Sequence, residues 1–242
     1  MLAHSLSARH PAVAGPPFRT DDPIPVEIGH WEVFTFSTGT RVSGDTSGTL
    51  PGIDANYGAA PDLQLHAALP IAFDASAGRT ARFGYGDTEF GFKYRFMAGD
   101  PLGWRPDAAI YPAIDFPTGA AGRNLGSGHT RLFLPLWLQK SLGKWTAFAG
   151  PGYWVNPGSG NRNFWYFGWA VQRQLTDTPN VGAEIFHQTP DTVDGKAQTG
   201  FDLGLTYDLS DHYHLLFSAG RGIQHARATN EFSHYAALQW TF

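Results

Sequence analysis

Cysteine is absent from this chain of 242 residues, and methionine occurs only twice. A chain without cysteine has neither disulfides nor thiolate ligands for a metal, so its stability has to come from packing and backbone hydrogen bonds. Excess positive charge is also lacking, because the formal net charge is −4 at pH 7. The sequence therefore gives no argument for a nucleic-acid partner, and we expect none.

Long hydrophobic runs are missing as well. No segment approaches the roughly 18 consecutive apolar residues that indicate a transmembrane helix, and the mean hydropathy is −0.25. The chain is instead rich in glycine, with 29 residues, and in aromatic side chains, at 14% of the total. That combination is typical of proteins with many strands and turns, whose hydrophobicity is hidden in alternation along each strand.

The last stretch of the chain, residues 230–242, shows this alternation most fully. Alternate residues of a strand point to opposite faces, and one face here carries Phe232, His234, Ala236, Leu238, Trp240 and Phe242. A tilted strand needs roughly 9–11 residues to cross a bilayer, which is about the length of this stretch. The last strand of a soluble β-sandwich would look similar, so the rest of the chain has to separate the two.

Four internal segments repeat the two-faced pattern, at residues 63–73, 87–96, 130–142 and 199–209. In the second of these, Phe90, Phe92, Tyr94 and Phe96 alternate with charged or small residues. A period of two that holds for about ten residues predicts strands and not helices. Weaker segments bring the expected number of strands to about twelve: 30–36, 52–59, 105–116, 145–155, 163–175, 180–188 and 212–220.

The predicted connections alternate in length. Those after even-numbered strands are mostly tight turns, with 97–104 intermediate, whereas those after odd-numbered strands are long: 38–51, 74–86, 117–128, 156–162, 189–197 and 221–229. Outer-membrane barrels have an even number of strands, short periplasmic turns and long external loops. We therefore predict an all-β protein, an antiparallel up-and-down transmembrane β-barrel of about twelve strands in the bacterial outer membrane. Tryptophans expected near strand ends, at the level of the lipid headgroups, are Trp31, Trp104, Trp145, Trp154, Trp165 and Trp240.

The first 26 residues differ from the rest. Prolines between Pro16 and Pro25 remove backbone donors and exclude regular structure there, which predicts an extended linker or a plug-like leader. No apolar core of signal-peptide length is present, yet Ala12-Val13-Ala14 before Gly15 resembles a cleavage site. We expect residues 1–26 to be a leader remnant with a proline-rich segment, and residues 27–242 to form a single transmembrane barrel.

Several motifs carry a family resemblance: Phe18–Pro23, Gly29–Glu32, Gly91–Phe96, Pro135–Lys140, Gly150–Trp154, Glu184–Thr189 and Leu238–Phe242. The chain resembles a family of Gram-negative outer-membrane barrels described as transporters related to a protein of the meta-pathway of phenol degradation. The resemblance covers nearly the whole chain after Gly15, although an evident signal peptide is lacking. It implies passive passage of small molecules across the outer membrane, and the preference for hydrophobic or aromatic ones rests on the resemblance alone.

Alternation also predicts which polar side chains point inward. Many of these charges should pair across strands, because an isolated charge away from bulk water is costly. They form either a salt-bridged structural network or a polar path for a solute, and Lys93 and Arg95 fit either role. The expected lumen-lining residues are Glu32, Asp62, His66, Asp87, Glu89, Lys93, Arg95, Asp115, Arg131, Glu184, Asp202, His214 and Glu231.

Other functions find less support. The histidines show no HExxH or comparable spacing, so we expect no metal and no cofactor. A lipid hydrolase or deacylase remains an alternative through Ser127, His129 and Asp115, but no GxSxG elbow is present. A structural barrel without conductance is the third hypothesis. The expected partners are outer-membrane lipid, a small-molecule solute and the barrel-assembly machinery, because the ending at Phe242 resembles the terminal signature recognised for insertion.

Overall fold

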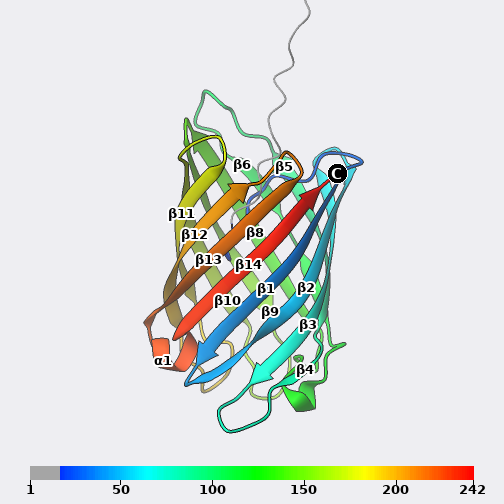
Figure 1. The fold of residues 1–242 in the computed structure, drawn as a ribbon, viewed down its shortest axis with the longest axis vertical. Helices are drawn as coiled ribbons and strands as arrows, with labels where there is room; N and C mark the ends of the chain where they lie inside the picture. Colours follow the sequence, from blue (N-terminus) through cyan, green and yellow to red (C-terminus); the bar gives the residue numbers. More distant parts are fainter. Residues whose placement is uncertain (1–16) are drawn as a thin grey trace, which may run out of the picture.

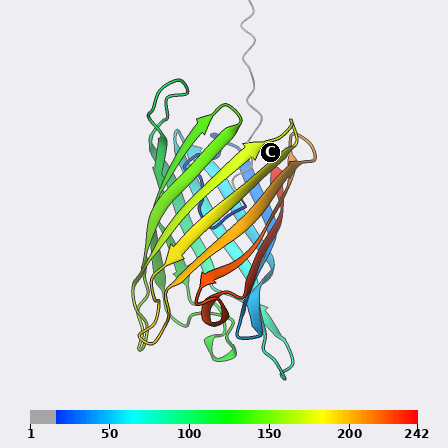
Figure 2. The ribbon, with the colours of Figure 1, turned by 90° about the vertical axis from the view of Figure 1, so that its left-hand side faces the viewer.

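The computed structural model describes residues 17–242, so the proposed cleavage site at residues 12–14 lies outside the described part. One sheet of fourteen strand segments closes on itself, because β1 pairs with β14, and the neighbours are antiparallel (Figures 1 and 2). In chain order the strands are β1 (Trp31–Val42), β2 (Asp45–Ala60), β3 (Leu63–Ala75), β4 (Arg82–Tyr85), β5 (Thr88–Met97), β6 (Asp107–Ile110), β7 (Ala113–Phe116), β8 (Arg131–Leu142), β9 (Trp145–Val155), β10 (Phe164–Gln174), β11 (Pro179–Gln188), β12 (Gln198–Asp208), β13 (Tyr213–Gln224) and β14 (Phe232–Thr241).

Two strands of the barrel are each interrupted once. β4 and β5 pair in succession with β3, and β6 and β7 both lie between β5 and β8. Gly86-Asp87 separates the first two segments and Tyr111-Pro112 the second two. Proline has no N–H to give to the ladder, which explains the second break. The fourteen segments therefore form a closed barrel of twelve strands, and the predicted fold is confirmed.

The two ends of the barrel differ. At one end Pro61-Asp62 joins β2 to β3, and Gly143-Lys144 joins β8 to β9. The opposite end carries residues 117–130 with a short 3₁₀ helix, and residues 225–231 with the single-turn helix α1 (Ala226–Thr229). We call these the short-turn end and the long-loop end; in an outer-membrane barrel they face the periplasm and the exterior, respectively. The C-terminus lies at the short-turn end (Figure 1).

The predicted loop at 38–51 is wrong. β1 and β2 continue through it to a turn of two residues, Ser43 and Gly44, whose φ angles are 51° and 88°. Positive φ at both central positions gives a turn whose twist matches that of the flanking strands. The Ser, Thr and Gly content suggested a loop, whereas pairing with β14 and β3 keeps these residues in the sheet. Similarly, β13 extends to Gln224, into the loop predicted at 221–229.

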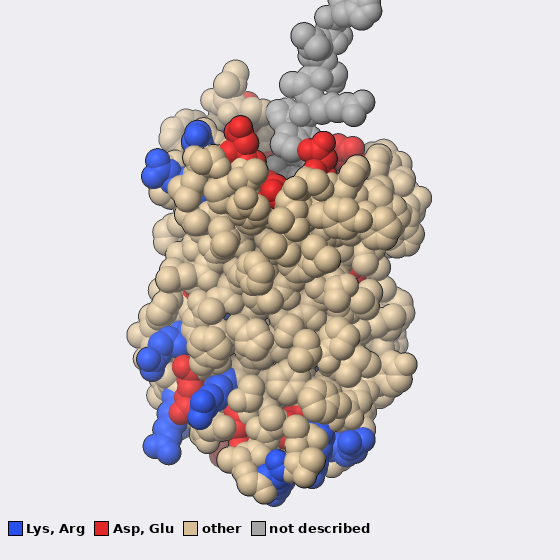
Figure 3. Space-filling model, in the orientation of Figure 1, with Lys and Arg blue, Asp and Glu red and all other residues tan. Residues whose placement is uncertain are grey.

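The outer surface carries a continuous apolar belt. Leu203 and Leu134 are exposed at 61% and 44%, and Figure 3 shows charged side chains gathered toward the two ends of the visible face. Aromatic rings stack near the short-turn end, with ring centroids 4.1 Å apart for Trp240 and Phe242. Trp154 differs, because its ring stacks on Phe133 and lines the interior. Within residues 17–242, no helix has the length and apolarity to cross a bilayer.

Residues 17–30, the N-terminal segment, precede β1; residues 17–26 lie inside the barrel, and the exposed residues 27–30 connect them to β1 at the short-turn end (Figures 1 and 2). Pro17, Thr20 and Pro23 are fully buried. The barrel wall makes room for them with glycine: a Cβ atom at Gly168 would collide with the Thr20 hydroxyl, and one at Gly204 with the Phe18 ring. The inner wall is therefore shaped to hold this segment.

Candidate functional site: the barrel lumen

The N-terminal segment is attached to the inner wall through Glu184 on β11. The backbone N–H groups of Thr20 and Arg19 donate to its two carboxylate oxygens at 2.7 and 3.1 Å. The Tyr166 hydroxyl on β10 donates to Oε1 at 2.8 Å. Arg19 reaches the next strand, with Nε 3.9 Å from Oδ2 of Asp202. Glu184 and Asp202 are therefore occupied by the protein itself.

Lys93 on β5 holds the same segment from the opposite side. Its Nζ lies 3.1 Å from Oδ2 of Asp21 and 3.7 Å from Oδ1 of Asp22. The ammonium also lies 5.1 Å from the centre of the Tyr111 ring, within the range of a cation–π interaction. Lys93 is only 4% exposed, and a buried cation requires partners of this kind.

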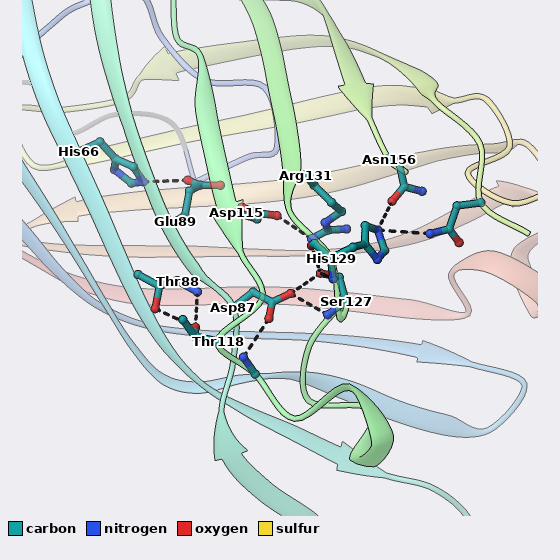
Figure 4. A network of polar contacts seen from close by, with 12 residues as sticks. His66, Asp87, Thr88, Glu89, Asp115, Thr118, Ser127, His129, Arg131 and Asn156 are labelled. Carbon is teal, nitrogen blue, oxygen red and sulfur yellow. Dashed lines mark hydrogen bonds and ion pairs between the residues drawn. The ribbon is translucent and has the colours of Figure 1, made fainter. Parts of the chain in front are cut away.

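His66 on β3 forms a second buried cluster. Its Nε2 lies 2.8 Å from Oε1 of Glu89 (Figure 4). Its Nδ1 lies 3.1 Å from Oδ1 of both Asp54 and Asn56. The Asn56 oxygen also accepts from Nε2 of Gln64 at 2.6 Å. The imidazole is thus fixed between two carboxylates on neighbouring strands.

Asp115 and Asp87 serve different partners near this cluster. Asp115 on β7 accepts from Nη2 of Arg131 at 2.7 Å, and that guanidinium stacks 5.0 Å from the centre of the Trp154 ring. Asp87 accepts from the backbone N–H and the hydroxyl of Ser127, both at 2.6 Å (Figure 4). Asp87 therefore anchors the loop of residues 117–130.

The remaining predicted residues lie toward the two ends. Arg95 pairs with Asp62 at 2.6 Å and with Asp107 at 3.4 Å at the short-turn end. His214 contacts Asp208 at 2.6 Å there. At the long-loop end Glu231 lies 3.7 Å from Nε of Arg41 and accepts from the Gly44 N–H at 2.9 Å. The structure does not join these residues to the central clusters.

A cavity of about 1030 Å³ lies between the N-terminal segment and the barrel wall. Of the predicted residues, Glu32, His66, Glu89 and Lys93 line it. It extends to the short-turn end, because Asp211, His212 and Phe242 also border it. Sequence reasoning missed Asp21 and Asp22, and it missed the aromatic part of the lining, which includes Phe34, Tyr111, Phe133, Trp137, Trp154 and Tyr235.

A partial signal for these inward aromatics exists in β8. There Phe133 and Trp137 alternate with leucines, so both faces of the strand are apolar. A barrel strand needs only one apolar face to contact lipid. The second apolar face of β8 therefore indicates that aromatic side chains pack inside the barrel. Trp137 is 1% exposed and packs near Tyr166 and Phe186.

The residues considered for hydrolysis do not form a Ser–His pair in the structure. The Ser127 hydroxyl is bonded to Asp87 and to the backbone oxygen of His129. The His129 imidazole instead contacts Asn156 at 3.0 Å and Asn161 at 3.2 Å (Figure 4). Asp115 is paired with Arg131. Among residues 17–242, no group of three or more acids and histidines is arranged to hold a metal ion.

A family model described as "Putative MetA-pathway of phenol degradation" matches residues 32–241. The chain belongs to this family. The match spans β1 to the end of β14, so it covers the whole barrel and leaves out the N-terminal segment. The resemblance inferred from the sequence motifs is confirmed. A comparison with curated proteins finds no match.

Solved structures show the same fold at low identity. The KdgM porin, in complex with disordered oligogalacturonate, is 8% identical with a TM-score of 0.57, covering 86% of this chain and 99% of its own. The NanC porin is 9% identical with a TM-score of 0.54, covering 87% and 98%. Outer membrane phospholipase A from Escherichia coli is 13% identical and covers 93% and 91%, but its TM-score of 0.45 carries no functional argument. The fold is thus that of outer-membrane barrels, which agrees with the apolar belt and the expected location in the outer membrane.

Proposed function

We propose that this barrel lets small molecules cross the outer membrane by passive diffusion through its lumen. The cavity of about 1030 Å³ that reaches the short-turn end is the observation that carries this proposal. Pockets that hold small molecules usually have volumes of roughly 300–1,000 Å³. Passage of a solute accounts for this internal space, whereas a purely structural role does not require a cavity.

The cavity lining supports small solutes with an apolar or aromatic part. Rings from several strands, among them Phe133, Trp154 and Tyr235, border the space together with charged groups. Offset or edge contacts between aromatic rings contribute about 0.5–1.5 kcal/mol beyond burial of their area. Membership of the phenol-degradation family agrees with such a solute.

The N-terminal segment sets the size limit in this proposal. It occupies the lumen between Lys93 on β5 and Glu184 on β11, so a solute has to pass beside it or displace it. The predicted lumen charges are largely paired with each other or with this segment, and they therefore contribute a structural network that also borders the path. Asp87 and Glu231, which hold loop residues and a turn, have structural roles in this proposal.

Proteoliposome swelling tests the function directly. The refolded protein is reconstituted, and swelling is compared between a small aromatic alcohol, a monosaccharide and a trisaccharide, with protein-free liposomes as the control. We expect uptake to fall with solute size and to favour the aromatic alcohol over a polar solute of similar size. Absence of swelling and of single-channel conductance would instead support a structural barrel.

The hydrolase alternative has its own assay. Mixed micelles of phospholipid or lipopolysaccharide are incubated with the refolded protein, and released fatty acid is measured. We expect no release, because the Ser127 hydroxyl has an acidic and a backbone partner where a serine nucleophile needs a general base. Release that disappears in Ser127→Ala would overturn this part of the proposal.

A further inference from the structure

Glu32 differs from Asp21, Asp22, Asp54 and Glu89, the other partly buried acids of the cavity lining; Glu27 and Asp211, which also border the cavity, are exposed. Asp21 and Asp22 contact Lys93, while Asp54 and Glu89 contact His66. The Glu32 carboxylate has no hydrogen-bond or ion-pair partner among residues 17–242. It is partly buried and borders the cavity, and a carboxylate held away from bulk water without a counter-ion is costly.

The strands beside Glu32 do not supply a partner. In the sheet it faces Asn56 on β2 and Thr241 on β14. The Asn56 amide donates to Asp54 at 2.9 Å, and the Thr241 hydroxyl donates to the backbone oxygen of Asp211 at 3.3 Å. Neither side chain donates a hydrogen bond to Glu32, which is left facing the space.

Cations within reach are also engaged. The cavity is bordered by Arg19 and Lys93, but Arg19 contacts Asp202 and Lys93 already serves two aspartates. Inside the cavity the acidic residues therefore exceed the permanent cations, and an anionic ligand would be repelled. The acids of this lining are Asp21, Asp22, Glu27, Glu32, Asp54, Glu89 and Asp211.

The walls are suited to an organic cation and not to a bare metal ion. Phe34 and Tyr235 border the cavity along with Glu32, and the faces of aromatic rings attract ammonium groups. Trp137, 1% exposed, lines the same cavity, and its indole N–H has no acceptor among the residues that the structure describes. A buried N–H without an acceptor is unusual in folded proteins.

We propose that this cavity binds a small organic cation, an ammonium group on an aromatic or apolar body, with Glu32 as its counter-ion. This proposal adds a ligand class to the proposed passage function. It rests on that function only because the cavity lies on the proposed path. Glu32 supplies the charge, and the rings enclose the apolar body. The excess of acid in the cavity excludes carboxylates of the same size.

Three probes of similar size and different charge test the proposal. Benzylamine, benzyl alcohol and benzoate are titrated into the refolded full chain in detergent at pH 7, and binding is measured by calorimetry. We expect benzylamine to bind at least tenfold more tightly than benzyl alcohol, and benzoate to bind most weakly. Equal affinities for benzylamine and benzyl alcohol in the unaltered protein would overturn the proposal without any variant.

Glu32→Gln isolates the counter-ion. Benzylamine should then bind no more tightly than benzyl alcohol, whose own affinity should stay the same. Asp194→Asn, a change from carboxylate to amide in the exposed loop between β11 and β12, is the control and should retain the tenfold preference. Heat-modifiable migration of each refolded variant establishes that the barrel has formed. Unchanged benzylamine binding in folded Glu32→Gln would contradict the role of Glu32.

The outcome for passage is separate. Swelling with neutral solutes but no preference for benzylamine would support passage and contradict the cation site. A clear preference for benzylamine without swelling or conductance would support the cation site and contradict passage.

Discussion

The backbone N–H of Thr20 lies 2.7 Å from Oε1 of Glu184, a residue 164 positions later in the chain. Both residues are buried, at 0% and 2% exposure. A hydrogen bond to a charged group contributes roughly 1.5–3 kcal/mol, and its loss removes one of several donors to a buried carboxylate. This contact therefore holds the N-terminal segment within the lumen and couples it to the barrel wall.

Gly168→Ala should release the N-terminal segment. An added Cβ would collide with the Thr20 hydroxyl and approach the Tyr166 ring, so one side of this contact has to move. We expect trypsin to cleave after Arg19 in the reconstituted variant, and single-channel conductance to rise, while the barrel still migrates as folded. Gly122→Ala is the control, because no atom lies within 4 Å of its added Cβ. A protected Arg19 with unchanged conductance would show that the segment is not held in this way.

Lys93→Ala should destabilise the protein more than Arg95→Ala. Removing one partner of a buried ion pair costs about 3–5 kcal/mol, and Lys93 is buried against Asp21 and Asp22. Arg95 is partly exposed at the short-turn end, where such a pair contributes about 0–1 kcal/mol. Denaturant unfolding of the refolded variants measures the difference. Unchanged stability of Lys93→Ala with increased cation conductance would favour a constriction over a structural network.

Leu203→Arg should impair assembly. Leu203 is among the most exposed side chains of the apolar belt, at 61%, and arginine on the lipid face costs roughly 2–4 kcal/mol near the bilayer midplane. Folding into liposomes, followed by heat-modifiable migration, gives the yield. Val193→Arg, in the exposed loop between β11 and β12, should fold like the parent. Equal yields for the two variants would place Leu203 outside the hydrocarbon region.

Deletion of Phe242 should reduce insertion in cells more than refolding in vitro. The Phe242 N–H donates to Trp31 at 3.0 Å, and its carbonyl accepts from the Trp31 N–H at 2.8 Å, so the residue joins β14 to β1. Its ring stacks on Trp240. Membrane fractions and refolding yields of the truncated and full chains are compared. Equal amounts in the outer membrane would contradict a role of this residue in recognition by the assembly machinery.

The sequence by itself determined the barrel and the direction of its side chains. Alternation in β5 places Phe90 and Phe92 outside and Lys93 inside, and a strand offers no other arrangement because its period is two. The alternating segments gave the number of strands, and the connection lengths distinguished the two ends. Local chemistry misled where strands extend beyond the apolar belt, as on either side of the Ser43-Gly44 turn, because turn-forming residues there are held in the sheet by pairing.

Only the tertiary structure decided what fills the barrel. Asp21 and Asp22 contact Lys93, which lies more than seventy residues later in the chain. Thr20 contacts Glu184, which lies 164 residues later. The alternation of residues along a strand cannot predict such contacts. They depend on how a proline-rich segment without regular structure folds back into the lumen. The same is true of Glu32: its inward direction follows from alternation, but its lack of a partner follows from where Asn56, Thr241 and Lys93 direct their own hydrogen bonds.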